Sequence, residues 1–99
     1  PVAKRRLLDL AKAPHVGMRS AAALGLAKRE DGEARAALQI LLSDEAAGVR
    51  VAALSGLRGE DRLKPFLEDE SPQVRAAALQ ALTKELGKPQ TASRAATPR

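Results

Sequence analysis

Small and apolar side chains recur along the chain in three nine-residue segments that align without a gap. They read MRSAAALGL at 18–26, VRVAALSGL at 49–57 and VRAAALQAL at 74–82. Each has an aliphatic residue or methionine, then arginine, alanine at positions four and five, a small residue at eight and leucine at nine. Self-similarity of this kind is typical of repeat proteins.

The spacing of apolar residues within the segments predicts helices. In the third segment the apolar residues fall at i, i+3, i+4, i+7 and i+8, which places them in one stripe: Val74, Ala77, Ala78, Ala81 and Leu82. A second apolar segment precedes each of the three, at 7–13, 37–44 and 62–69. The repeating unit is therefore predicted to be a pair of helices joined by a short polar turn.

Turn and cap residues delimit these helices. Ser71 and Pro72 predict an N-cap and a first helical residue, and the sequences EDGE at 30–33 and RGED at 58–61 separate the units. Pro65 either opens a short helix of its own or kinks a longer one.

The repeats occupy the first part of the chain and leave a polar segment after it. Gly87, followed two residues later by Pro89, predicts the end of the last helix, and residues 88–99 have almost no apolar content. We expect a repeat domain over 1–87 and a disordered basic tail over 88–99. The expected repeats span about 2–30, 33–58 and 60–87.

Composition narrows the possible classes of protein. The chain of 99 residues, 44% hydrophobic and 29% charged, fits one folded helical domain whose core is built from Leu, Ala and Val. The absence of cysteine excludes disulfides and thiolate metal sites and favours the cytoplasm. No apolar run is long enough to cross a membrane, and the charges at Asp9 and Lys12 argue against a signal peptide after the basic residues 4–6.

The net charge of +5 is concentrated at the two ends of the chain. Residues 1–29 carry seven basic and one acidic side chains, a net of +6, whereas residues 30–87 carry seven and eleven, a net of −4. Residues 88–99 add three basic side chains. This distribution weakens the case for a basic groove that runs along the body and binds nucleic acid.

The repeated phrases resemble known helical repeats. SPQVRAAALQAL, AGVRVAALSGL and HVGMRSAAALGL are similar to HEAT repeats of the short, phycobilisome-lyase-like type, over roughly residues 2–87. The resemblance implies an all-α fold, a short right-handed α-solenoid of about three HEAT-like helix pairs, or about six helices. Stacking of successive pairs would then bury one continuous core.

One arginine per repeat is a candidate for ligand binding or for a structural contact: Arg19, Arg50 and Arg75. Asp44 and Asp69 stand six residues before the second and third arginines, as the family pattern has it, whereas Ala13 stands six before the first. The resemblance implies that each arginine closes back on that acid, Arg50 on Asp44 and Arg75 on Asp69. We therefore expect all five of these arginines and aspartates to be structural, and a phosphate-binding ladder of arginines is the alternative.

Two further sets of positions are candidates for partner contact. Basic residues near the ends of the second helices either complement the helix dipole or form a rim facing an acidic partner: Lys28, Arg58 and Lys84. Small and weakly polar residues lie off the packing stripe, where the resemblance implies a concave surface: Ser20, Leu24, Val51, Ser55, Ala76 and Gln80. A trough of this kind suits a peptide or a helix.

Nothing in the sequence predicts catalysis, a cofactor or a metal site. His15 stands alone at a turn beside Pro14, and no histidine lies at a spacing that would activate a serine. There is no Gly-rich phosphate loop. The leading hypothesis is a non-catalytic protein–protein interaction or scaffold module, in whole or as a fragment of a larger protein, that binds a peptide or helix on its concave face.

Alternatives remain open at this point. One is a nucleic-acid-binding HEAT-like module that uses the basic ends, and another is an accessory subunit of a lyase-type enzyme. Self-association is also possible, because the terminal helices are expected to leave leucines partly uncovered at each end of the array: Leu7, Leu8, Leu10, Leu79, Leu82 and Leu86.

Overall fold

The computed structural model describes residues 2–87, and all its regular elements within that range are helical. Three helices form an inner row: α2 (Val16–Ala27), α4 (Ala47–Leu54) and α6 (Pro72–Gly87). An outer helix precedes each of them: α1 (Val2–Leu10), α3 (Gly32–Leu41) and α5 (Glu60–Leu63), the last continued by the 3-10 helix η1 (Lys64–Glu68). The prediction of an all-α solenoid of about six helices is confirmed.

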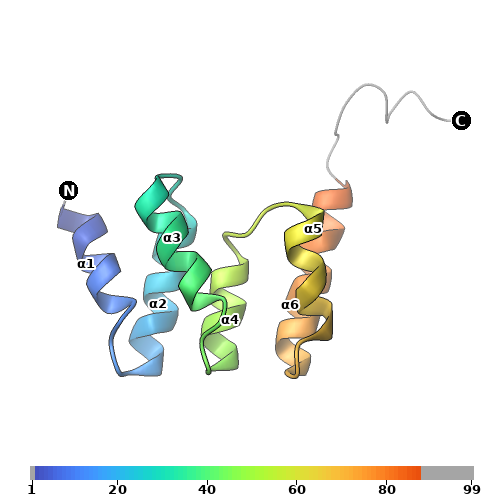
Figure 1. The fold of residues 1–99 in the computed structure, drawn as a ribbon, viewed down its shortest axis with the longest axis horizontal. Coiled ribbons are helices and arrows are strands. Elements are labelled where there is room, and N and C mark those ends of the chain that lie inside the picture. Colours follow the sequence, from blue (N-terminus) through green and yellow to red (C-terminus); the bar gives the residue numbers. More distant parts are fainter. Residues whose placement is uncertain (1, 88–99) are drawn as a thin grey trace, which may run out of the picture.

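The helix pairs stack in chain order from one end of the array to the other (Figure 1). α2 packs against α4 and α4 packs against α6, while each outer element packs against the inner helix that follows it. Each pair thus contacts its neighbours along the row, as in other solenoids.

Close approach of the inner helices depends on the small residue at the eighth repeat position. A Cβ atom added to Gly56, in the turn that follows α4, would lie 2.8 Å from the Cα of Ala27 and 2.9 Å from Cδ1 of Leu38. An added Cβ on Gly25 would lie 2.7 Å from Cδ2 of Leu7, a side-chain end in α1 that can move, whereas Gly56 faces backbone. Glycine at position 56 therefore allows a close backbone approach that a larger residue would prevent.

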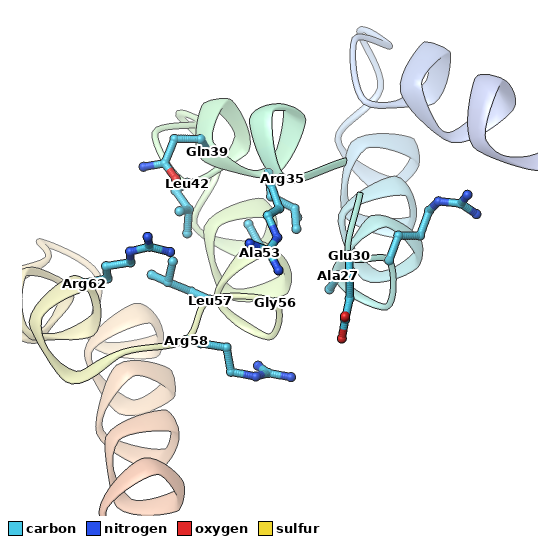
Figure 2. Close-up of a pocket in the computed structure, with 12 residues that line it drawn as sticks. Ala27, Glu30, Arg35, Gln39, Leu42, Ala53, Gly56, Leu57, Arg58 and Arg62 are labelled. Carbon is cyan, nitrogen blue, oxygen red and sulfur yellow. The ribbon is translucent and has the colours of Figure 1, made fainter. Parts of the chain in front are cut away.

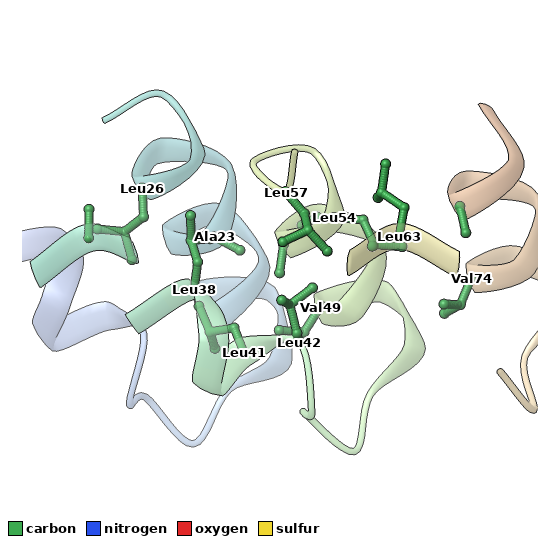
Figure 3. Close-up of a cluster of buried hydrophobic side chains, with 14 of the residues drawn as sticks. Ala23, Leu26, Leu38, Leu41, Leu42, Val49, Leu54, Leu57, Leu63 and Val74 are labelled. Carbon is green, nitrogen blue, oxygen red and sulfur yellow. The ribbon is translucent and has the colours of Figure 1, made fainter. Parts of the chain in front are cut away.

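The core is one continuous cluster that runs through all three pairs (Figure 3). In α6 the predicted stripe faces this core, with Val74, Ala78 and Leu82 buried and the two alanines between them half-buried. The expectation that Leu82 would be uncovered is wrong, because it lies on the same face as Val74 and Ala78. Leu79, on another face of the helix, is exposed as expected.

The turns follow the cap chemistry of the sequence. The hydroxyl of Ser71 accepts a hydrogen bond from the backbone N–H of Gln73 (3.2 Å), and α6 begins at Pro72 as predicted. Pro65 lies in the first turn of η1, so the third outer element is a short α-helix followed by a separate 3-10 turn. His15 caps α2, where its Nδ1 accepts from the N–H of Gly17 (3.2 Å). The tail predicted for 88–99 lies outside the described residues.

Candidate protein-interaction site

The repeat arginines connect one helix pair to the next. Nε of Arg19 donates to Oδ2 of Asp44 (2.8 Å), and its Nη2 donates to Oδ1 (3.1 Å). Arg50 contacts Asp69 in the same way, through Nε (3.0 Å) and Nη2 (2.9 Å). Each pair is a bidentate arginine–carboxylate contact, the arginine coming from one repeat and the aspartate from the following one.

We expected Arg50 to pair with the carboxylate of Asp44 and Arg75 with that of Asp69. This expectation is wrong. Each arginine does contact the residue six positions earlier, but Nη1 donates to its backbone carbonyl, at 2.7 Å for both. Arg19 makes the same contact with the carbonyl of Ala13 (3.0 Å). A carbonyl is present whatever the side chain, which is why alanine serves at this position in the first repeat.

Each aspartate carboxylate is held by a backbone N–H of its own turn, in an orientation away from the arginine of the same repeat. Oδ1 of Asp44 accepts from the N–H of Ala46 (2.9 Å), and Oδ1 of Asp69 accepts from the N–H of Ser71 (2.9 Å). The same carboxylates face the preceding arginine, whose hydrogen bonds hold the pKa of both aspartates below the ordinary value. Arg50 is 8% exposed, so its contact with Asp69 lies mostly out of water.

A groove lies between α4 and α6, with a volume of about 820 Å³. Six apolar residues line it: Val51, Leu54, Leu57, Ala77, Leu79 and Ala81. Polar and charged side chains stand around these apolar residues: Ser55, Arg58, Gln80, Thr83, Lys84 and Glu85. The groove therefore combines an apolar surface with hydrogen-bonding groups, two cations and one carboxylate.

The structure gathers only part of the predicted contact set at this groove. Five of the nine predicted residues line it: Val51, Ser55, Arg58, Gln80 and Lys84. The remaining four lie outside its lining: Ser20, Leu24, Lys28 and Ala76. Of these, Lys28 is the C-cap of α2, a position at which a basic residue complements the helix dipole, as one of the two interpretations of the basic set expected.

A second and smaller hollow of about 140 Å³ lies at the junction of α2, α3, α4 and α5. Figure 2 shows Arg35, Arg58 and Arg62 around Ala53, Gly56 and Leu57. Within residues 2–87, the guanidinium groups of Arg35 and Arg62 form no hydrogen bond or ion pair. We call this hollow the arginine notch, and Arg58 also lines the groove, so the two are adjacent.

Sequence reasoning missed Arg35 and Arg62, although a signal was present. The phrase Gly-Glu-X-Arg occurs at 32–35 and again at 59–62, at the start of two successive outer helices. Repetition of a basic residue at one repeat position would have predicted that the two lie on the same edge of the array.

The basic N-terminal residues are partly neutralised within the fold. Nζ of Lys4 lies 2.8 Å from Oε1 of Glu33 and 3.4 Å from Oδ2 of Asp31.

Over residues 2–87 no group of three or more His, Asp or Glu side chains could hold a metal ion. In the same part of the chain no helix is long and apolar enough to cross a membrane.

Comparison with known proteins agrees with this geometry. Residues 63–82 match the family model of a HEAT repeat associated with sister chromatid cohesion. The third helix pair is similar to a HEAT repeat. The predicted HEAT resemblance is confirmed by this match, whereas the phycobilisome-lyase type is not confirmed. No curated protein and no solved structure matches the chain. HEAT repeats generally mediate protein interactions, so an interaction-type repeat module is the coarse functional class that the match supports.

Proposed function

We propose that this protein is a non-catalytic interaction module that binds an acidic, amphipathic peptide or helix in the groove between α4 and α6. The observation that carries the proposal is the composition of that groove. Apolar side chains of both helices line it, and Arg58 and Lys84 supply positive charge at the same place. A partner helix with apolar anchors on one face and carboxylates beside them complements both features.

The apolar anchors of the partner would contact Val51, Ala77 and Ala81. These side chains are small or half-buried, so they form a shallow surface and leave volume for the larger side chains of a partner. Alanine on α6 has no rotamer freedom to lose when it is covered, which lowers the entropic cost of binding.

The charged groups would set orientation and association rate rather than most of the affinity. Arg58 lies between the groove and the arginine notch, so positive charge continues from Lys84 past Arg58 to Arg35 and Arg62. Residues 30–87 carry a net charge of −4 even with these four cations included, so the rest of that part of the chain is acidic. This local excess of positive charge would favour an acidic segment over a neutral one.

The test is selection of binding peptides from a random displayed library, followed by fluorescence anisotropy with the full chain. We expect the selected peptides to carry acidic residues and apolar residues at i, i+3 or i+4 spacing. The variant Ser55→Glu/Gln80→Glu places two negative charges in the groove and should weaken binding by at least about tenfold, or roughly 1.4 kcal/mol.

A matched control makes the same two chemical changes outside the groove. Ser43→Glu/Gln73→Glu alters two exposed positions that do not line it, so affinity should be unchanged. Equal loss in both variants would show a general charge effect and would contradict the groove as the binding site.

The nucleic-acid alternative gives a distinct result in the same assay. Lys4 is engaged by two carboxylates, which reduces the positive charge that the N-terminal end offers to phosphates. Duplex DNA and tRNA should therefore bind weakly at low salt. Strong binding that falls steeply with added salt and is insensitive to the groove variant would favour nucleic acid instead.

A further inference from the structure

The turns between the outer and inner helices repeat with the same geometry in all three pairs. In each, the residue six before the repeat arginine, at 13, 44 and 69, precedes the inner helix by three residues. In each, Nη1 of the arginine donates to the carbonyl of that residue. Arg19, Arg50 and Arg75 are thus held in equivalent positions, which permits a direct comparison of their remaining donors.

Among the residues that the structure describes, Arg75 differs from Arg19 and Arg50 because its Nε and Nη2 have no acceptor. Nε and Nη2 of Arg19 and Arg50 bind an aspartate of the following pair. Arg75 is exposed, and within residues 2–87 its side chain makes only the Nη1 contact to the carbonyl of Asp69. Residues 88–99 contain no aspartate or glutamate, so their side chains supply no carboxylate for it.

An apolar position next to each arginine shows the same difference. Leu54, four residues after Arg50, is 2% exposed in the core cluster that also holds Leu63 of the third pair. Leu79, four residues after Arg75, is 59% exposed. The surface formed by Arg75 and Leu79, here called the α6 face, is therefore an uncovered copy of a surface that α4 buries against a helix pair.

We infer that the α6 face docks a helix pair of a partner protein that presents an aspartate in the turn before its second helix. Asp44 and Asp69 define the chemistry. Each gives both carboxylate oxygens to an arginine and is held in place by an N–H two residues further on. A partner turn of this kind would place its carboxylate on Nε and Nη2 of Arg75, and its apolar residues would cover Leu79.

A second copy of this chain does not supply the required aspartate in the same register. The first pair carries Ala13 where the second and third pairs carry Asp44 and Asp69. Head-to-tail stacking of two copies would leave Arg75 without a carboxylate, so the arrangement disfavours open-ended self-assembly and favours a partner with the acid.

The substitution Ala13→Asp tests this inference with the full chain as its own probe. The variant presents an aspartate at the first turn, whose backbone matches the other two turns, and the N–H of His15 is available to hold the carboxylate. Sedimentation velocity should show head-to-tail association of the variant, on the order of 10- to 100-fold tighter than for the unsubstituted chain. Ala13→Asn, which has the same shape without the charge, should sediment like the unsubstituted chain.

A second substitution identifies the arginine that is responsible. Ala13→Asp/Arg75→Gln should remain as weakly associated as the unsubstituted chain, and circular dichroism should show that all the variants are folded. The inference is overturned if folded Ala13→Asp does not associate, or if it associates equally without Arg75. Leu79 lines both the α6 face and the groove, whereas Ala13 and Arg75 lie outside the groove lining. Because the test changes only residues 13 and 75, its failure is distinguishable from failure of the groove experiment.

Discussion

The α6 face and the surface of α4 that packs against the third helix pair present the same residue types. They differ because only the α4 surface is covered by another helix pair. At the interface, Arg50 is bound by Asp69 and Leu54 is buried. At the α6 face, Arg75 and Leu79 occupy the same repeat positions and are exposed. The role of a repeat residue is therefore set by the neighbouring helix pair. A similar sequence phrase can be structural in one repeat and available for recognition in another.

Truncation of the two equivalent leucines should give the largest contrast. Leu54→Ala removes core side-chain atoms and should lower the free energy of unfolding by about 2–5 kcal/mol. Leu79→Ala changes an exposed side chain and should alter it by less than about 0.5 kcal/mol. Urea titrations followed by circular dichroism measure both, since the chain has no Trp or Tyr. Similar losses in the two variants would mean that the α6 face is covered in solution.

A pair of double-mutant cycles should separate the two arginines that lie near Asp69. The cycle of Arg50→Gln with Asp69→Asn should give a coupling energy of about 1–2 kcal/mol, because a mostly buried bidentate contact is lost. The cycle of Arg75→Gln with Asp69→Asn should give less than about 0.5 kcal/mol, because Arg75 uses the backbone carbonyl, which the substitution retains. A larger coupling energy for Arg75 with Asp69 than for Arg50 with Asp69 would show that the carboxylate pairs with the arginine of its own repeat.

Acid should weaken the two interfaces between helix pairs by protonating Asp44 and Asp69. Hydrogen bonds from Arg19 and Arg50 lower the pKa of Asp44 and Asp69 in the folded chain, so the unfolded chain binds more protons between the two sets of pKa values. Their contribution to stability is therefore complete above the ordinary pKa of 3.8 and is lost as pH falls through the lowered folded values.

The measurement is the urea midpoint as a function of pH below 5. Asp44→Asn/Asp69→Asn should be less stable than the unsubstituted chain at neutral pH, and its midpoint should fall less steeply with acid. Some dependence should remain, because a hydrogen bond from Lys4 also lowers the pKa of Glu33. Parallel curves for the two proteins would contradict a role for these aspartates.

Most of the fold follows from the sequence because local rules fix it. The apolar stripe of α6 and the cap at Ser71 act through one helix face or through neighbours close in the chain. The small residue at the eighth repeat position was recognised because it recurs, although its contacts are with other helices. Leu82 was expected to be partly uncovered although it belongs to the predicted stripe of α6. Its burial depends on how far the neighbouring elements α4, α5 and η1 cover the end of that stripe.

The contacts between repeats were harder to predict. A spacing of six residues between Asp44 and Arg50 correctly places the two groups near each other, but it does not distinguish a carboxylate from the carbonyl of the same residue. The turn at Asp44 directs the carboxylate toward Arg19, 25 residues away in the chain. The groove was predicted in part, since Val51, Ser55 and Gln80 lie on the inner helices or at their ends, where partner contacts were expected. Arg35 and Arg62 of the arginine notch were missed because they lie on the outer helices.

Hydrogen exchange of the arginine side-chain Nε–H protons tests the central comparison most directly. In an NMR spectrum of the full chain, assigned with single Arg→Lys variants, the Nε–H protons of Arg19 and Arg50 should exchange slowly, because each donates to a mostly buried carboxylate. The Nε–H of Arg75 should exchange at the rate of a solvated arginine. Equal protection of all three, or rapid exchange at Arg50, would contradict the account.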